Sequence, residues 1–132
     1  METSLVLIKP DAVERNLIGE ILSIYEANNL KITNLKLVSA DVELAKEHYI
    51  EHDGRPYFDE LIKYITRSPI VALTLEGESA ISRVREINGA TSPSEAKPNT
   101  IRAKFAISKN ENSVHASDSL ESAKREIEIW FK

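Results

Sequence analysis

The chain has 132 residues, a formal net charge of −4 and no cysteine. Its acidic balance gives no general attraction to nucleic acid or to an anionic membrane surface, so neither is expected as a specific partner. The lack of cysteine excludes disulfide bonds and thiolate metal sites. We find no leader-like segment and no apolar run of membrane-spanning length, and therefore expect a cytoplasmic protein with a single domain over residues 1–132.

The first part of the chain predicts strands that alternate with helices. Residues 5–8 (LVLI) form a continuous apolar run typical of a strand buried on both faces, and Pro10 suits the first turn of a following helix. The apolar spacing over residues 19–30 predicts an amphipathic helix. Residues 32–38 predict a second strand, and residues 41–49 predict a helix capped by its first residue, an aspartate.

The middle of the chain continues the same alternation. DGRPYF (residues 53–58) predicts a turn, and the apolar residues between 58 and 65 predict a helix. IVALTL (residues 70–75) is rich in branched side chains and predicts a third strand. Residues 79–88 predict a helix, with Gly89 as its left-handed C-terminal residue.

The last part of the chain begins with a segment that has no periodicity. Residues 90–100 carry two prolines, and a stretch this long without a pattern is usually functional or disordered. FAIS (residues 105–108) predicts a fourth strand. Asp118 and Glu121 resemble a capping box that opens a final helix. Its apolar side is predicted to carry Leu120, Ala123, Ile127, Trp130 and Phe131.

This order of elements favours a two-layer protein. Strands alternating with helices predict an α/β or α+β sandwich in which helices pack on a small sheet. A split β-α-β arrangement of the ferredoxin-like kind is one solution for such an order.

His115 is the first candidate for chemistry, because NENSVHASDSLES surrounds it with small polar residues. A neutral imidazole offers a ring lone pair and can act as a nucleophile without a separate base. Attack on a phosphoryl group needs space and nearby donors, such as Ser117, Asn112 and the N–H groups that open the final helix. The alternative is a surface-loop histidine beside a helix cap.

Three cations support a phosphate site. Lys9 follows the first buried strand, Arg85 lies near the end of the helix before the long loop, and Arg102 leaves that loop. The chain has four glycines and neither GxxxxGK[ST] nor GxGxxG, so side-chain cations rather than a glycine-rich loop would hold phosphates. Each cation alone is typical of a solvated surface charge.

Two further functions stay open on these residues. HYIEH (His48 to His52) matches the H-x-x-E-H pattern of some zinc peptidases, although a third ligand and a peptide cleft are still needed. A non-enzymatic α/β module that binds a ligand or a partner is also compatible with the predicted fold.

A family resemblance separates these possibilities. NSVHASDSL (residues 112–120) resembles the nucleoside diphosphate kinase signature N-x-x-H-[GA]-S-D at every specified position. Five further segments are similar to the family and occur in the same order. They are LIKPDAVERNLIGEI, LAKEHY, RPYF, GATSPSEAKPNTIRAKF and HASDSLESAKREIEIWF. This resemblance covers nearly the whole chain. It implies a ferredoxin-like α+β sandwich with a four-stranded antiparallel sheet, and transfer of the γ-phosphate of a nucleoside triphosphate, typically ATP, to a nucleoside diphosphate by a ping-pong mechanism.

The resemblance also implies roles at the phosphate end of the site. His115 matches the family's phosphohistidine, formed at the ring nitrogen nearer the backbone. Lys9, Arg85 and Arg102 match phosphate-binding cations, and Thr91 matches a hydroxyl donor.

The remaining implied residues support the histidine or bind the nucleoside. Ser117 and Glu126 match the pair that supports the histidine, and Tyr49 matches a tyrosine beside Lys9. Asn112 matches the amide that meets the sugar hydroxyl. Tyr57 matches the aromatic residue that stacks on the base, with Leu61 one helical turn beyond it.

The family further implies substrates bound as magnesium complexes, with no separate protein metal site, and a homo-oligomer. Because no longer C-terminal tail follows residue 132, we expect a dimer-based tetramer rather than a hexamer. The chain departs from the usual family pattern at four positions. These are Tyr57 for phenylalanine, Asn99 for glycine, and the charged residues Lys109 and Glu111.

Overall fold

The computed structural model of the protein describes residues 1–132. Its strands are β1 (Glu2–Ile8), β2 (Lys31–Val38), β3 (Ile70–Gly77) and β4 (Val114–Ala116). Its helices are α1 (Pro10–Glu14), α2 (Ile18–Ala27), α3 (Val42–His48), α4 (Phe58–Ile65), α5 (Ala80–Asn88), α6 (Ile101–Phe105) and α7 (Leu120–Trp130), with a 3-10 turn at Ile50–His52.

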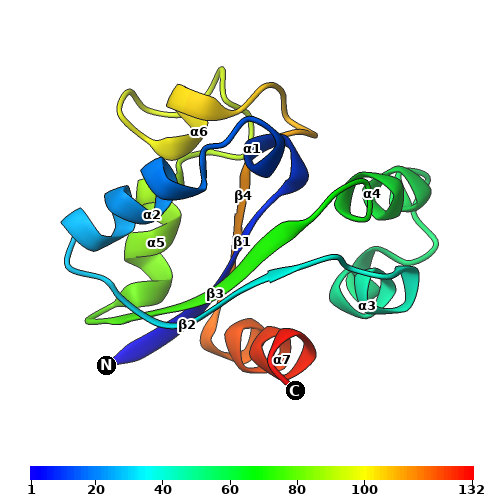
Figure 1. Ribbon diagram of the computed structural model, residues 1–132, viewed down its shortest axis with the longest axis horizontal. Coiled ribbons are helices and arrows are strands. Elements are labelled where there is room, and N and C mark those ends of the chain that lie inside the picture. The colour runs from blue at the N-terminus through cyan, green and yellow to red at the C-terminus, as the bar shows by residue number, and fades with distance from the viewer.

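The four strands form one antiparallel sheet in the order β2-β3-β1-β4. β1 therefore lies inside the sheet, and β4 runs along its other side as an edge strand. Figure 1 shows α2 and α5 on one face of this sheet and α3, α4 and α7 on the other. The predicted ferredoxin-like α+β sandwich is confirmed.

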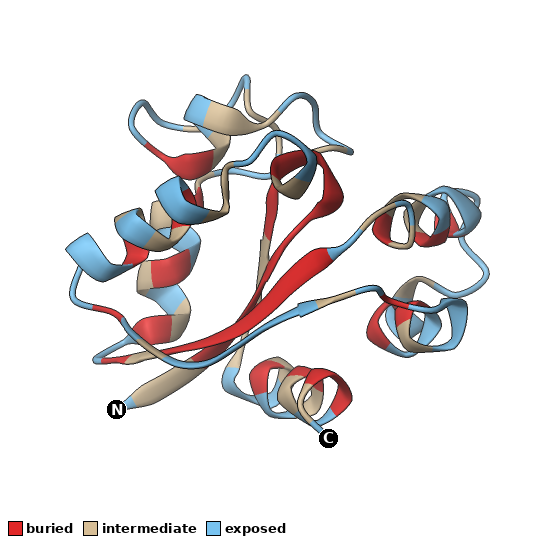
Figure 2. Ribbon diagram, viewed as in Figure 1, coloured by how far each residue is buried: buried red, intermediate tan, exposed pale blue.

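The sheet separates two apolar cores. Val6 and Ile8 of β1 belong to the core beneath α2 and α5, whereas Leu5 and Leu7 belong to the core beneath α3, α4 and α7. Alternate residues of a strand point to opposite faces, so one short apolar run supplies both cores. β1 and β3 are accordingly the most buried parts of the molecule (Figure 2). The prediction of a strand buried on both faces at residues 5–8 is confirmed.

β2 differs from the two inner strands because most of its residues are exposed. Leu35 is 50% exposed and Leu37 is 65% exposed. An edge strand with exposed apolar residues offers unpaired backbone groups to another chain.

The predicted fourth strand at residues 105–108 is wrong. Thr100 caps α6 by accepting a hydrogen bond from the Ala103 N–H, and Phe105 is the last residue of that short helix. The strand that completes the sheet is β4, in which His115 is paired with Leu7 of β1. Three residues are too few to show periodicity, so only the pairing with β1 defines this strand.

The final helix begins one residue later than the predicted cap implied. Ser119, rather than Asp118, is the N-cap, and its hydroxyl accepts a hydrogen bond from the Ser122 N–H. Leu120 is 59% exposed and does not belong to the buried side of the helix. Asp118 accepts hydrogen bonds that lower the pKa of its carboxyl, chiefly from Ser122.

Two further predictions concern helix ends. The helix at residues 41–49 is shorter than predicted, because Tyr49 is its C-cap rather than part of its apolar stripe. Gly89 follows α5 with a positive φ of 88°, as predicted, but its ψ of 176° lies outside the left-handed helical region. Asn99 also has a positive φ of 72°, a conformation that asparagine accepts more readily than most residues.

None of the helices is both long enough and apolar enough to cross a membrane.

Candidate active site

A cleft of about 1160 Å³ lies where the end of β1, the end of α3, the loop after α5 and the start of α7 meet. It brings together most of the predicted site residues. Those that line it are Lys9, Tyr49, Arg85, Thr91, Arg102, Asn112, His115 and Glu126. Ser117 is buried behind the cleft wall, and Tyr57 and Leu61 are not lining residues.

His115 points its outer ring nitrogen at a buried carboxylate. Its Nε2 lies 2.9 Å from Oε1 of Glu126, and the same oxygen accepts a hydrogen bond of 2.7 Å from the Ser117 hydroxyl. A carboxylate is only an acceptor, so Nε2 must carry the proton in this arrangement. The free lone pair of the neutral ring then lies on Nδ1, the nitrogen nearer the backbone.

The backbone holds this group of side chains in place. The Ser117 N–H donates to the Leu5 carbonyl at 3.0 Å, and the Leu5 N–H donates to the Ser117 hydroxyl oxygen at 3.2 Å. Glu126 is only 4% exposed and approaches from α7. β4 and α7 together therefore fix both the histidine and the carboxylate that orients it.

A second histidine, His48, packs edge-on against His115 with 4.6 Å between ring centroids. Its Nδ1 accepts a hydrogen bond of 3.1 Å from the Trp130 indole N–H. Burial, followed by the charge of His115, lowers the pKa of His48 well below its ordinary value. Because an indole N–H can only donate, neutral His48 carries its proton on Nε2.

This geometry bears on the zinc hypothesis. His48, His115 and Glu126 place their potential ligand atoms within 4.8 Å of one another. However, the Nδ1 lone pair of His48 faces the Trp130 indole and its Nε2 is protonated, so this ring has no free lone pair for a metal. His52 is not part of the group, because its Nδ1 lies 2.7 Å from the Tyr57 hydroxyl and α3 has ended at His48. The HYIEH pattern is therefore not assembled as a zinc site.

Lys9 lies at the end of β1 and is 8% exposed. Its Nζ donates a hydrogen bond of 3.0 Å to Oδ1 of Asn112. Burial, and secondly the charge of Arg102, lower the pKa of Lys9 from its ordinary value of 10.5 to about 8, while Asp11 acts in the opposite direction. The ammonium group is thus incompletely solvated, which favours contact with an anionic ligand.

Arg102 is held by two backbone carbonyls. Its Nη1 donates to Gly89 at 2.8 Å, and its Nη2 donates to Val114 at 2.7 Å. Burial lowers the pKa of Arg102, but a guanidinium remains charged in proteins. Arg85 is exposed and close enough for its charge to act on both Arg102 and Asp118. The cleft therefore gathers the three predicted cations, and Lys97 and Arg125 also line it, in a chain whose net charge is −4.

Three of the four buried side-chain polar atoms without a hydrogen-bond partner belong to residues that line this cleft. They are the Tyr49 hydroxyl, Asn88 Nδ2 and Arg102 Nε. Such unsatisfied groups are uncommon in folded proteins and are tolerated where they serve a function. Burial also raises the pKa of Tyr49, which keeps its hydroxyl protonated as a donor.

Tyr57 lies at the end of the turn before α4, and Leu61 lies on α4. Tyr57 is 46% exposed and is tied to the cleft through its hydroxyl contact with His52, which is a lining residue. Leu61 packs partly buried against the core beneath α4. The structure thus assembles the predicted phosphate end of the site more closely than the predicted base end.

Two residues with no role predicted from the sequence lie in or beside the site. His48, predicted only as part of a zinc pattern, lines the cleft, and Asp11, part of the LIKPDAVERNLIGEI stretch that is similar to the family, lies beside it. Asp11 is 1% exposed and hydrogen-bonds to the segment that precedes His115. Its position two residues after Lys9 was the available signal, but a sequence does not show which segment a carboxylate meets.

Comparisons with known proteins place the whole chain in one family. The family model described as "Nucleoside diphosphate kinase" matches residues 2–132. A nucleoside diphosphate kinase of Clostridium perfringens is 60% identical over 131 residues, which cover 99% of this chain and 92% of that protein. One from a Thermoanaerobacter species is 52% identical and is covered over 97% of its length.

A solved structure extends the likeness to the fold. A crystal structure of the Aquifex aeolicus nucleoside diphosphate kinase superposes with a TM-score of 0.97 at 45% sequence identity, covering 99% of this chain and 95% of that one. A family match over almost every residue, relatives of this identity and a shared fold lead to one conclusion. The chain belongs to the nucleoside diphosphate kinase family.

Proposed function

We propose that the protein transfers the γ-phosphate of a nucleoside triphosphate, typically ATP, to a nucleoside diphosphate through a phosphohistidine at His115. The observation that carries this proposal is the contact between Nε2 of His115 and the Glu126 carboxylate. It leaves the Nδ1 lone pair available on a ring that is partly exposed and lines the cleft. Membership of the family supports the same reaction.

The two half-reactions are balanced. In the first, the Nδ1 lone pair forms a bond to the γ-phosphorus as the bond from that phosphorus to the β,γ-bridging oxygen breaks, and the nucleoside diphosphate leaves. In the second, a terminal oxygen of another nucleoside diphosphate attacks the phosphorus, and the N–P bond breaks. The carboxylate of Glu126, positioned by Ser117, stabilises the positive charge that develops on the imidazole in the first step.

The cations act on the phosphate oxygens. Phosphoryl transfer depends mostly on positioning and charge stabilisation, so Lys9, Arg85 and Arg102 are assigned to the transferred group and its neighbours. Thr91 and Tyr49 supply hydroxyl donors at the same end of the cleft. Asn112 is assigned to the sugar hydroxyl, and Tyr57 with Leu61 to the base. The Tyr57 ring retains the stacking face of the usual phenylalanine, which suits recognition of different bases.

Magnesium enters as part of the substrate in this proposal. The only cluster of three or more potential ligands is His48, His115 and Glu126, which is rich in nitrogen and already hydrogen-bonded. Magnesium prefers oxygen ligands and is commonly carried by nucleotide phosphates. We therefore assign no resident metal site to the protein.

We also propose a cytoplasmic homo-oligomer of single-domain subunits, with a dimer-based tetramer favoured over a hexamer. The exposed leucines on the edge strand β2 support association between copies of the chain. The lack of cysteine supports a reducing compartment. The two cores share one sheet, which supports a single folding unit.

The phosphorylated intermediate tests the proposed reaction. After incubation with γ-labelled ATP and magnesium, the protein should carry one acid-labile, base-stable phosphate, because a phosphoramidate differs from a serine ester in this way. His115→Ala should abolish both the label and transfer to a diphosphate. His52→Ala is the matched control, since it removes another imidazole of the cleft but should retain the label. An acid-stable label, or a labelled His115→Ala protein, would refute the assignment.

A further inference from the structure

Asp11 forms a buried junction beside the cleft. Its carboxylate is 1% exposed and accepts hydrogen bonds from the Tyr64 hydroxyl, from Arg15 Nη2 at 2.9 Å, and from both the N–H and the hydroxyl of Ser113 at 3.1 and 2.8 Å. Donors from α1, from α4 and from the segment before β4 thus meet at one side chain. A buried charge so completely paired holds its partners tightly, because losing one leaves an uncompensated group.

Ser113 occupies a backbone conformation that needs such support. Its φ is 72°, in the left-handed region that costs free energy for a residue with a side chain. Strained conformations persist where the surroundings over-determine them, and they occur frequently at functional sites. Here both hydrogen-bond donors of Ser113 end on the same carboxylate. The two hydrogen bonds to Asp11 therefore stabilise this conformation.

The residues on either side of Ser113 carry the site. Its own carbonyl accepts a hydrogen bond of 2.8 Å from the Lys9 N–H, and the preceding Asn112 side chain accepts one of 3.0 Å from Lys9 Nζ. The following Val114 carbonyl accepts one of 2.7 Å from Arg102. The next residue is His115. A change in the backbone at Ser113 would move all of these groups relative to one another.

We propose that Asp11 is a positioning residue for phosphoryl transfer, which sets Asn112, Lys9 and His115 in register by holding Ser113 in its left-handed conformation. The inference rests on the proposed reaction at His115. Asp11 does not line the cleft and acts through Ser113 and Lys9. A small displacement of the catalytic groups is sufficient to slow such a reaction, because its rate depends on how these groups are aligned with the substrate.

The test compares Asp11→Asn with Glu14→Gln. Asparagine has a similar shape but turns an amide donor towards groups that themselves donate, so the Ser113 contacts are weakened. The rate at which His115 is labelled, measured by rapid quench at saturating ATP, should fall about tenfold. Glu14 lies on the same helix and accepts hydrogen bonds from Arg67 and Ser68 at the surface. Its amide variant should label at the wild-type rate.

A pH profile separates the effect of the Asp11 charge on Lys9 from the positioning role of Asp11. The charged groups that act on Lys9 are Arg102 and Asp11, and the Tyr64 ring lies 5.9 Å from Nζ. Asp11 raises the pKa of Lys9 against the effect of burial, so removing the carboxylate charge lowers that pKa further. Measured at low ATP, where the rate reports the free enzyme, the alkaline limb of the labelling rate should move to lower pH in Asp11→Asn and stay unchanged in Glu14→Gln and Ser113→Ala, which keep this charge. A purely structural role would lower the unfolding temperature of Asp11→Asn but leave the labelling rate of the folded protein below this limb unchanged.

Ser113→Ala keeps the test decisive if Asp11→Asn does not fold. It removes the hydroxyl bond, retains the N–H bond and changes no charge, and the labelling rate should fall about threefold. Folded Asp11→Asn protein with a wild-type labelling rate below the alkaline limb would overturn the proposal, as would a wild-type rate in Ser113→Ala where Asp11→Asn is unfolded. Absence of His115 labelling in the wild-type protein would instead overturn the proposed function.

Discussion

At the scale of single residues, the chain places the Nδ1 lone pair of His115, the Glu126 carboxylate and the cations Lys9, Arg85 and Arg102 around one cleft. The site residues were predictable from the sequence through the family resemblance, but their bonds were not. Nothing in the order of residues shows that Trp130 donates to His48, or that Asp11 meets Ser113. Contacts between residues about 80 or 100 positions apart depend on how β1, β4 and α7 are brought together.

Lys9 makes the reaction sensitive to alkaline pH. Its ammonium form attracts phosphate, and its pKa of about 8 means that this form is lost as the pH rises through that value. In the free enzyme, kcat/KM should therefore begin to fall as the pH rises past about 7 and should fall about tenfold per unit well above pH 8. Lys9→Arg should react more slowly but lose this limb, because a guanidinium stays protonated. A limb that is unchanged in Lys9→Arg would assign the titration to another group.

At the scale of elements, long apolar patterns were predictable and short elements were not. The helices α4 and α5 and the strand β3 lie close to their predicted ranges because their own side chains show their burial pattern. FAIS has the composition of a strand, yet its first residue ends the helix that Thr100 caps. β4, with only three residues, is defined by β1. Tertiary pairing therefore overrode local propensity at the element that carries His115.

The turn between α5 and α6 should respond strongly to one methyl group. A Cβ at Gly89 would lie 2.5 Å from the Thr100 hydroxyl oxygen, and the φ of 88° already disfavours a side chain. Gly89→Ala should reduce the free energy of unfolding by about 2 kcal/mol or more, measured by urea denaturation. It should also slow transfer, because the Gly89 carbonyl accepts a hydrogen bond from Arg102.

Gly54→Ala is the matched control for this prediction. Gly54 has a similar φ of 86°, but nothing lies within 4 Å of its added Cβ. It therefore shares the conformational strain without the collision. Equal destabilisation in the two variants would show that the contact with Thr100 relaxes freely and does not hold the turn.

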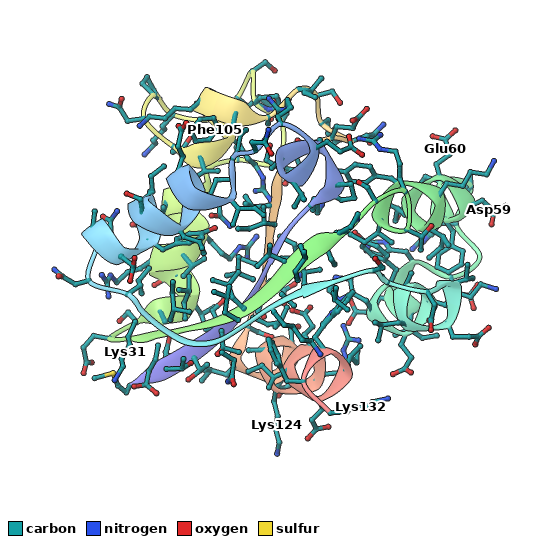
Figure 3. All side chains as sticks on the ribbon, in the orientation of Figure 1. Lys31, Asp59, Glu60, Phe105, Lys124 and Lys132 are labelled. Carbon is teal, nitrogen blue, oxygen red and sulfur yellow. The ribbon has the colours of Figure 1, made fainter.

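At the scale of the whole molecule, the charged side chains at the periphery differ in their burial from those that line the cleft. The labelled charged side chains Lys31, Asp59, Glu60, Lys124 and Lys132 all project from the periphery (Figure 3). Of the cations that line the cleft, by contrast, Lys9 is buried and Arg102 is half-buried. The two-layer fold was predictable because alternation of strands and helices limits the possible architectures. The assembly was less predictable than the fold, because β2 is exposed only as a result of the strand order, in which β3 and β1 occupy the middle of the sheet.

The exposed edge of β2 gives the prediction for assembly. Leu37 is 65% exposed beside backbone groups that no other strand of the chain pairs, so Leu37→Glu should place a charge in a contact between copies. Sedimentation should show the wild-type protein as a tetramer and the variant shifted towards smaller species at the same concentration. Leu120→Glu is the control, because Leu120 is similarly exposed at 59% but lies at the start of α7. Equal dissociation of both variants would argue against β2 as the contact, and a monomeric wild-type protein would refute the proposed homo-oligomer itself.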